Sequence, residues 1–367
     1  MGDPPIPLTH DELTPAWLTA ALRSSGAVRT ARVVGFDAEP IGAGVGFVGD
    51  IARLRLLYDA EESAPATVIV KLPTMEPRRR MMGSAARLFE REIRFYRDIA
   101  PGIDVRAPRC YYAATSPEDG RHVLLLEDLA PAEPGDQLAG CSPERAEAAA
   151  RMVARLHAAW WQRDELATLD WMPLLAGVHP SAEAWWDEMW QRCVDRVGGR
   201  MPPAALRIGE RLGANAMWAM RQIDASPHTI VHGDYRLDNL FFGGDDARGG
   251  PAVVDWQLST RGCAVYDLAY LLSGSMAPAN RKRCEMDLIR AWHDELLARG
   301  VRGYSYEEAV RDYRLSVVVC LTFVTVMLNV VESADARALG LVDVVLDRSA
   351  AAVADLEVEE LLPRGTG

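Results

Sequence analysis

The sequence lacks the cysteine spacings that mark disulfide-stabilised or zinc-binding proteins. It contains six cysteines in 367 residues, with no C-x-x-C pair and no group of histidines beside them. A disulfide framework or a zinc site would require such patterns. We therefore interpret the cysteines as scattered reduced thiols, which is typical of a cytoplasmic protein.

Positive charge is also in short supply. The chain carries 40 Lys and Arg against 52 Asp and Glu, and its formal net charge is -12. A nucleic-acid partner would need an excess of basic residues to contact phosphates, so none is expected. The acidic balance is compatible with a cationic ligand without implying one, and a nucleotide would need local positive charge to offset this field.

The N-terminal residues, MGDPPIPLTHDEL, have neither a basic start nor an apolar segment, so no secretion signal is expected. One long apolar run, at residues 315–331, is short for a bilayer and includes Ser316, Thr322 and Asn329. We predict a buried helix of a large helical domain there, with a helix at a dimer interface as the alternative. The expected protein is a monomer or homodimer with no membrane partner.

The pattern of apolar residues changes along the chain. Residues 28–75 are rich in Val, Ile and Gly and indicate strands, a helix is predicted at about 80–99, and two more strands precede residue 128. A connector rich in Pro and Gly follows, and helical periodicity then dominates. The sequence thus predicts an α+β protein with a small β-rich lobe at 1–126, a connector at 127–141 and a larger helical lobe at 142–367.

Two helix starts are marked by their capping residues. Thr14 and Ser142 each stand directly before a proline, the arrangement of an N-cap followed by the first helical residue. Glu144 lies in the first turn of the second helix, where negative charge suits the helix N-terminus.

A glycine-rich segment, G-V-G-F-V-G, contains Gly44, Gly46 and Gly49. A dinucleotide site would need a helix directly after these glycines, but the alternating residues that follow favour a strand. A strand, a glycine loop and a second strand form a hairpin whose backbone can cover nucleotide phosphates, as in kinases. A plain glycine-rich turn is the alternative that the sequence leaves open.

Lys71 lies inside an apolar predicted strand, TVIVKLP, and needs either a partner or a route to the surface. Glu92 lies in the middle of the apolar face of the next predicted helix, whereas Glu90 falls on the opposite face. A carboxylate on an apolar face is costly unless it is paired. We predict that Lys71 and Glu92 pair and hold the ammonium group for nucleotide phosphates; two solvated side chains are the alternative.

Asp234, Asn239 and Asp255 follow short apolar segments in HGDYRLDN and VVDWQ. Phosphoryl transfer needs a carboxylate at the acceptor hydroxyl, oxygen ligands for Mg²⁺ and positive charge at the phosphates. Asp234 suits the first role, and Asn239 and Asp255 offer the oxygens that Mg²⁺ prefers.

These two segments resemble the catalytic loop and metal-binding aspartate of the aminoglycoside phosphotransferase and choline kinase group, small-molecule kinases with a protein-kinase-like fold. Together with FEREIRFY, LLLEDL, ARLHAAWW and VVDWQLSTRGCAVYDLAYLLSGS they resemble its ecdysteroid kinase-like branch. The resemblance covers about residues 40–275. It implies a bilobal fold, ATP and Mg²⁺ as cofactors and a hydroxylated small molecule as the partner.

The resemblance also implies a role for each matching residue. Asp234 would be the catalytic aspartate, Asn239 and Asp255 the Mg²⁺ ligands, and Lys71 with Glu92 the pair that positions the phosphates.

Further positions receive supporting roles from the same resemblance. The backbone from Glu127 to Leu129 would meet the adenine. His232 would support the catalytic loop, and Asp267 would cap a helix and hold that loop. Arg236, two residues after Asp234, departs from the family pattern, and it would either reach the transferred phosphate or lie at the surface.

The sequence leaves the identity of the acceptor molecule open. Six tryptophans lie between residues 160 and 190: Trp160, Trp161, Trp171, Trp185, Trp186 and Trp190. They indicate either an aromatic stripe in the core or an aromatic wall for a bulky, partly apolar acceptor. An antibiotic-inactivating kinase, such as one for aminoglycosides, and an inactive binding protein are the alternatives. His157, on a helix of Ala, Leu and Trp, is predicted to be a satisfied core histidine.

Overall fold

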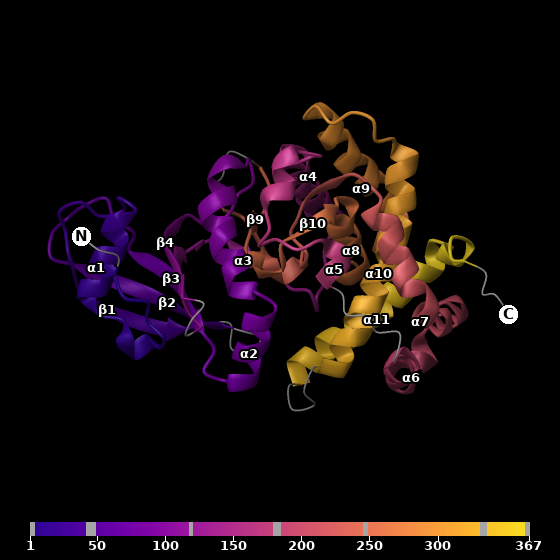
Figure 1. Cartoon of the computed structure of the whole chain (residues 1–367), viewed down its shortest axis with the longest axis horizontal. Coiled ribbons are helices and arrows are strands. Elements are labelled where there is room, and N and C mark those ends of the chain that lie inside the picture. Colours follow the sequence, from indigo (N-terminus) through magenta and orange to yellow (C-terminus); the bar gives the residue numbers. More distant parts are fainter. Residues whose placement is uncertain are drawn as a thin grey trace. The chain divides into compact units, whose positions relative to one another are not determined.

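The computed structural model describes residues 4–41, 49–116, 120–178, 185–244, 249–330 and 336–363. The chain divides into two compact units (Figure 1). The first comprises Met1–Gly102, Ala107–Ala132 and Val254–Leu258, and the second comprises Ile103–Arg106, Glu133–Val253 and Ser259–Gly367. The predicted connector at 127–141 is therefore shared between them, and a short segment around Asp255 joins the first unit.

The first unit is built on a five-stranded antiparallel sheet with the strand order β1-β2-β3-β5-β4. Its strands are β1 (Val33–Pro40), β2 (Gly49–Tyr58), β3 (Thr67–Pro73), β4 (Cys110–Ser116) and β5 (Arg121–Glu127). In β2, Ala52, Leu54 and Leu56 are buried and alternate with more exposed residues, as expected for a strand with one face on the core. All five strands had been predicted from the sequence.

Helix α1 (Pro15–Ser24) packs on this sheet. The Thr14 side chain accepts a hydrogen bond from the Trp17 backbone N–H, so the predicted N-cap is confirmed. Leu18 and Leu22, four residues apart on one helix face, are fully buried against the strands.

The helix predicted at 80–99 is interrupted. Helix α2 (Pro77–Ala85) is separated from α3 (Leu88–Arg94) by Arg87, whose φ of 53° lies in the left-handed region, and a π-helical turn at Phe95–Ile99 follows. A non-glycine residue seldom adopts this conformation, so the apolar periodicity gave no sign of the break. The apolar face that the sequence indicated is buried in α3 nonetheless, with Phe89 and Ile93 in the core.

The second unit is mostly helical. Its helices are α4 (Pro143–Ala159), α5 (Leu175–Val178), α6 (Trp186–Val197), α7 (Pro203–Asp224), α8 (Val265–Ser275), α9 (Pro278–Ala298), α10 (Tyr306–Val330) and α11 (Ala336–Asp355). Helix α8 is buried along nearly its whole length and packs on α4, α9, α10 and α11. Ser142 caps α4 as predicted, because its hydroxyl accepts a hydrogen bond from the Arg145 N–H.

Short strands carry the loops of interest in this unit. Strand β7 (His228–Val231) pairs with β10 (Thr260–Cys263), and β8 (Leu240–Phe242) pairs with both β6 (Glu133–Pro134) and β9 (Ala252–Val253). The segment HGDYRLDN lies between β7 and β8, and Asp255 follows β9. The sequence therefore places each predicted functional loop at the end of a strand.

The apolar run at 315–331 belongs to α10. Within the described residues, Tyr306–Asn329 is the one helix long and apolar enough to cross a membrane by length and composition. However, 61% of its most apolar window is buried, and α10 packs on α7, α8 and α11. This burial is the arrangement predicted for a core helix.

Candidate active site

Lys71 and Glu92 form an ion pair in the interior of the first unit. The Lys71 Nζ lies 2.6 Å from Glu92 Oε2, and the two residues are 7% and 2% exposed. Strand β3 brings the lysine and helix α3 brings the glutamate. The predicted pairing is therefore present, and it offsets the cost of burying each charge.

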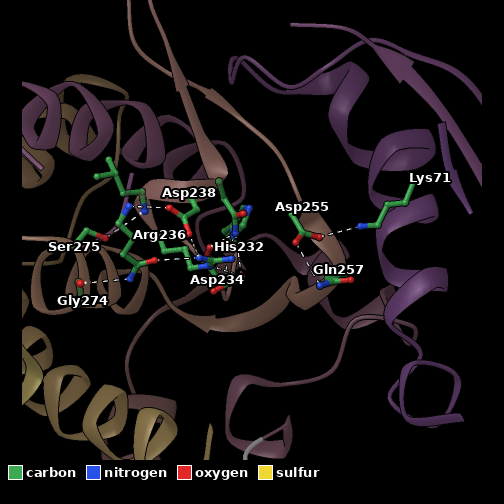
Figure 2. A network of polar contacts seen from close by, with 12 residues as sticks. Lys71, His232, Asp234, Arg236, Asp238, Asp255, Gln257, Gly274 and Ser275 are labelled. Atoms are coloured by element: carbon green, nitrogen blue, oxygen red, sulfur yellow. Dashed lines mark hydrogen bonds and ion pairs between the residues drawn. The ribbon is translucent and has the colours of Figure 1, made fainter. Parts of the chain in front are cut away.

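Asp255 is the second carboxylate on the same lysine. Its Oδ1 lies 3.1 Å from Lys71 Nζ, a contact that is visible in Figure 2. Burial alone would lower the pKa of Lys71, but the carboxylates of Asp255 and Glu92 outweigh it and raise that pKa. Burial raises the pKa of the Glu92 carboxyl, and Lys71 opposes this change.

The backbone at Asp255 is strained and its surroundings hold it in place. Its φ of 64° is in the left-handed region, a conformation that persists where the neighbouring structure imposes it and that is frequent at functional sites. Trp256 is buried and stacks on Phe95 with ring centroids 3.7 Å apart. Gln257 donates a long hydrogen bond from Nε2 to Asp255 Oδ2, at 3.4 Å.

Of the three predicted glycines, Gly44 and Gly46 lie outside the described residues. Gly49 begins β2, and a Cβ added there would stand 3.1 Å from Lys71 Cε and 3.2 Å from Lys71 Cγ. Glycine at this position thus lets the lysine side chain lie directly over the strand. Its predicted contact with a nucleotide stays a prediction.

The backbone predicted to meet the adenine begins at the end of β5. The Glu127 backbone N–H donates to the Arg109 carbonyl, and the Glu127 carboxylate accepts from the Arg109 N–H. The Leu129 carbonyl accepts from the Ala132 N–H. Both residues are half-buried, and their predicted role at an adenine stays a prediction.

Asp234 and Asn239 meet in the second unit. The Asn239 Nδ2 donates to the Asp234 carbonyl at 2.9 Å and to its carboxylate Oδ2 at 3.0 Å. Both residues are buried. Residues 234–239 therefore form a closed loop, in which the Asn239 side-chain NH₂ group is bound to Asp234 and the Asn239 side-chain oxygen can accept from or bind another partner.

A buried network holds the backbone of this loop. The Asp267 carboxylate accepts from the His232 N–H at 2.7 Å and from the Gly233 N–H at 2.9 Å. The His232 Nδ1 in turn accepts from the Asp234 N–H at 3.2 Å. The predicted support by His232 and Asp267 is present, but Asp267 is no helix cap: α8 begins after Ala264, and no side chain caps it.

His157 completes this network from α4. Its Nε2 lies 3.1 Å from Asp267 Oδ2, and its Nδ1 accepts from the Trp292 indole at 3.1 Å. Because Nδ1 is an acceptor here, the proton belongs on Nε2 and points to the aspartate. His157 is thus the satisfied core histidine that was predicted.

Arg236 is neither at the surface nor isolated. Its side chain is 14% exposed. It contacts Asp234 and Asp238 (Figure 2), and it also contacts Gln137. Asp238 and Gln137 were not predicted from the sequence. Asp238 stands inside the HGDYRLDN segment and could have been found there, whereas Gln137 lies in the connector and has no local signal.

The tryptophan-rich segment is largely core. Trp171, Trp186 and Trp190 are buried, and the Trp186 indole donates to the Gly209 carbonyl at 2.7 Å. Trp160 and Trp161 are half-buried, and Trp185 is 65% exposed. Trp171, Trp186 and Trp190 therefore belong to the core, the first of the two predicted arrangements, and the aromatic wall stays a prediction for the other three.

Each of the two units contains oxygen atoms of the kind that a hard cation prefers. Among the described residues, no group of three or more His, Cys, Asp or Glu side chains forms a metal site on its own. Mg²⁺ is commonly held by one or two protein oxygens together with phosphate oxygens and water. In the first unit, the Asp255 carboxylate and the buried Gln257 Oε1, which has no hydrogen-bond partner, are oxygens of this kind. In the second unit, the amide oxygen of Asn239 is another.

Solved structures with the same fold are small-molecule kinases. A choline kinase from Cryptosporidium parvum Iowa II has a TM-score of 0.51 and 12% identity, and 89% of each chain is covered. The GDP complex of aminoglycoside 2'-phosphotransferase-IIIa has a TM-score of 0.51 and 13% identity, with 86% of this chain and 93% of that chain covered. The fold is therefore α+β and protein-kinase-like, with a small antiparallel sheet and a larger helical part.

Curated relatives match only a short segment. Acyl-CoA dehydrogenase family member 11 of Gallus gallus is 36% identical over 81 residues, which is 22% of this chain and 10% of that protein. The same-named protein of Rattus norvegicus is 45% identical over 56 residues, 15% of this chain and 7% of that protein. The matched segment thus spans about a tenth or less of these relatives.

The family model matches most of the chain. The model of the ecdysteroid kinase-like family covers residues 43–300, which include every predicted site residue from Gly44 to Asp255. This is the branch that the sequence motifs had indicated, and the chain belongs to the ecdysteroid kinase-like family.

Proposed function

We propose that the protein transfers the γ-phosphoryl group of ATP to a hydroxyl group of a small molecule. The observation that carries this proposal is the Lys71 ammonium held between Glu92 and Asp255 at 2.6 and 3.1 Å. An ammonium group has three donors, and these two carboxylates use two of them, which leaves one for a phosphate oxygen. Positive charge fixed in this way is what a nucleotide needs in so acidic a protein.

Asp234 is the residue proposed to face the acceptor. The acceptor oxygen attacks the γ-phosphorus, and the bond between the γ-phosphorus and the β–γ bridging oxygen breaks to give ADP. The hydroxyl proton of the acceptor passes to the Asp234 carboxylate. Asn239 would hold Mg²⁺ through its amide oxygen while its NH₂ group stays on Asp234, and Asp255 would hold the ion through its carboxylate. When bound, the ion neutralises charge on the phosphates.

The proposed acceptor is a hydroxylated small molecule, bulky and partly apolar. The support for its apolar character comes from the exposed Trp185 and the half-buried Trp160 and Trp161, since the other tryptophans of this segment are buried. An aminoglycoside is the alternative acceptor, because a solved structure with this fold is an aminoglycoside phosphotransferase.

The proposal is tested by measuring nucleotide turnover. Purified protein is incubated with ATP or GTP, with and without Mg²⁺, and ADP or GDP release is followed. We expect slow release that requires Mg²⁺, favours ATP and is accelerated by a hydroxylated acceptor. Absence of Mg²⁺-dependent nucleotide binding and release would reject the proposal and favour an inactive binding protein.

A further inference from the structure

The guanidinium of Arg236 lies between two carboxylates of the same loop. Figure 2 shows Arg236 beside Asp234 and Asp238. Its Nε is 3.3 Å from Asp234 Oδ2, and its Nη1 is 2.6 Å from Asp238 Oδ2 and 3.1 Å from Gln137 Oε1. One aspartate would suffice to neutralise a half-buried arginine. The additional contact with Asp234 places the cation against the carboxylate that is proposed to face the acceptor.

The partners of Arg236 are themselves fixed. Asp238 Oδ1 accepts from the Gln137 N–H at 2.8 Å, and the Gln137 carbonyl accepts from Arg348 Nη1 at 2.6 Å. A Cβ added to Gly135 would lie 2.5 Å from the Leu237 carbonyl oxygen, so the backbones of the connector and the loop are in direct contact. Arg236 is therefore anchored by a rigid set of groups within the second unit.

Two donors approach the same oxygen of Asp234. Asn239 Nδ2 and Arg236 Nε both contact Oδ2, at 3.0 and 3.3 Å. A carboxylate oxygen accepts about two hydrogen bonds, so these donors occupy Oδ2.

We propose that Arg236 is a positioning residue that, with Asn239, fixes Asp234 Oδ2 and thereby assigns the acceptor proton to Oδ1. Asp238 and Gln137 act through Arg236 by fixing its guanidinium. This inference rests on the proposed function, because it specifies how the acceptor-facing carboxylate is oriented. Such positioning affects the chemical step, and a misplacement of about 1 Å can cost roughly 100-fold in rate.

The test compares Arg236→Gln and Arg236→Lys with wild type in Mg²⁺-dependent ADP release from ATP. We expect kcat to fall roughly 10- to 100-fold in Arg236→Gln and less in Arg236→Lys, while KM for ATP changes less than about twofold. Arg151→Gln is the matched control, since Arg151 pairs with Glu147 on the exposed face of α4, and its kcat should be unchanged.

Two further measurements separate positioning from a structural role. In Arg236→Ala, guanidinium at tens of millimolar should restore part of kcat, and it should not accelerate wild type. Asp238→Asn should lower kcat on its own but add nothing in the Arg236→Gln background, since both changes release the same contact.

The outcomes decide between the inference and the proposed function. Wild type without Mg²⁺-dependent ADP release would reject the function itself. An active wild type with an unchanged kcat in folded Arg236→Gln would overturn the inference alone. If Arg236→Gln does not fold, an unchanged kcat in folded Asp238→Asn would overturn it, and a lowered kcat with unchanged KM for ATP would support it.

Discussion

Replacing Glu92 by Gln should destabilise the first unit and disable the site. The change keeps the size of the side chain but removes the closest counter-charge of Lys71, at 2.6 Å in a buried position. Breaking a buried ion pair from one side commonly costs about 3–5 kcal/mol. Because Asp255 still lies 3.1 Å from the ammonium, we expect the lower end, ~3 kcal/mol.

Calorimetry and urea unfolding measure this loss, and ~3 kcal/mol corresponds to a melting temperature lower by roughly 6–12 °C. Glu90→Gln is a matched control on the same helix. Glu90 pairs with Arg87 at 2.7 Å, but the pair is partly exposed and should be worth less than about 1 kcal/mol.

The double variant with Lys71→Met tests the pairing directly. If the ion pair is the cause, removing Lys71 as well should recover part of the stability lost in Glu92→Gln. Equal losses in the Glu92 and Glu90 variants would refute the reasoning, as would stability in Glu92→Gln that matches wild type.

Two further predictions concern the metal ligands and pH. Asp255→Ala should weaken Mg·ATP binding more than Asn239→Ala does, because it removes a charged ligand. Excess Mg²⁺ should restore ATP binding better in Asn239→Ala than in Asp255→Ala. Calorimetric titration measures both effects, and an unchanged Mg²⁺ dependence of ATP binding in Asp255→Ala would contradict the assignment. Burial, assisted by the Lys71 ammonium, lowers the pKa of His122 to about 3. The unfolded chain binds this proton near pH 6.5 and the native state does not, so native stability is lost as pH falls below that value. The free energy of unfolding of His122→Phe, measured with urea and taken relative to wild type, should therefore be ~3 kcal/mol more favourable to the native state at pH 4.5 than at pH 7. The same difference between variant and wild type at both pH values would contradict the prediction.

The pairing of Lys71 with Glu92 was predictable because each residue broke a pattern. A lysine in an apolar strand and a carboxylate on an apolar helix face each need a partner, and the predicted helix is the next element after the predicted strand. The caps at Thr14 and Ser142 were predictable for a similar reason, since a local signal determines a local structure.

The contacts that sequence reasoning missed join distant residues. Arg236 meets Gln137 across 99 positions, and Lys71 meets Asp255 across 184. Nothing near Gln137 indicates that the connector returns to the catalytic loop. The break at Arg87 was missed because its left-handed backbone depends on tertiary packing rather than on local preference.

Burial of the tryptophans was also decided by tertiary packing. Trp186 lies against Gly213, where an added Cβ would stand 3.1 Å from its ring, and Trp190 packs on Gly209 in the same helix. Glycines one turn apart on α7 therefore accept the aromatic residues of α6. Helical spacing alone left both a core stripe and an acceptor wall open.

The most direct test of the account is phosphate transfer by wild type and Asp234→Asn to a pool of hydroxylated metabolites, followed by mass spectrometry. We predict that wild type with Mg·ATP adds one phosphoryl group to an acceptor. Folded Asp234→Asn should bind ATP with similar affinity yet form almost no product. Product formation by Asp234→Asn at a rate near that of wild type would contradict the assignment of Asp234 to the acceptor hydroxyl.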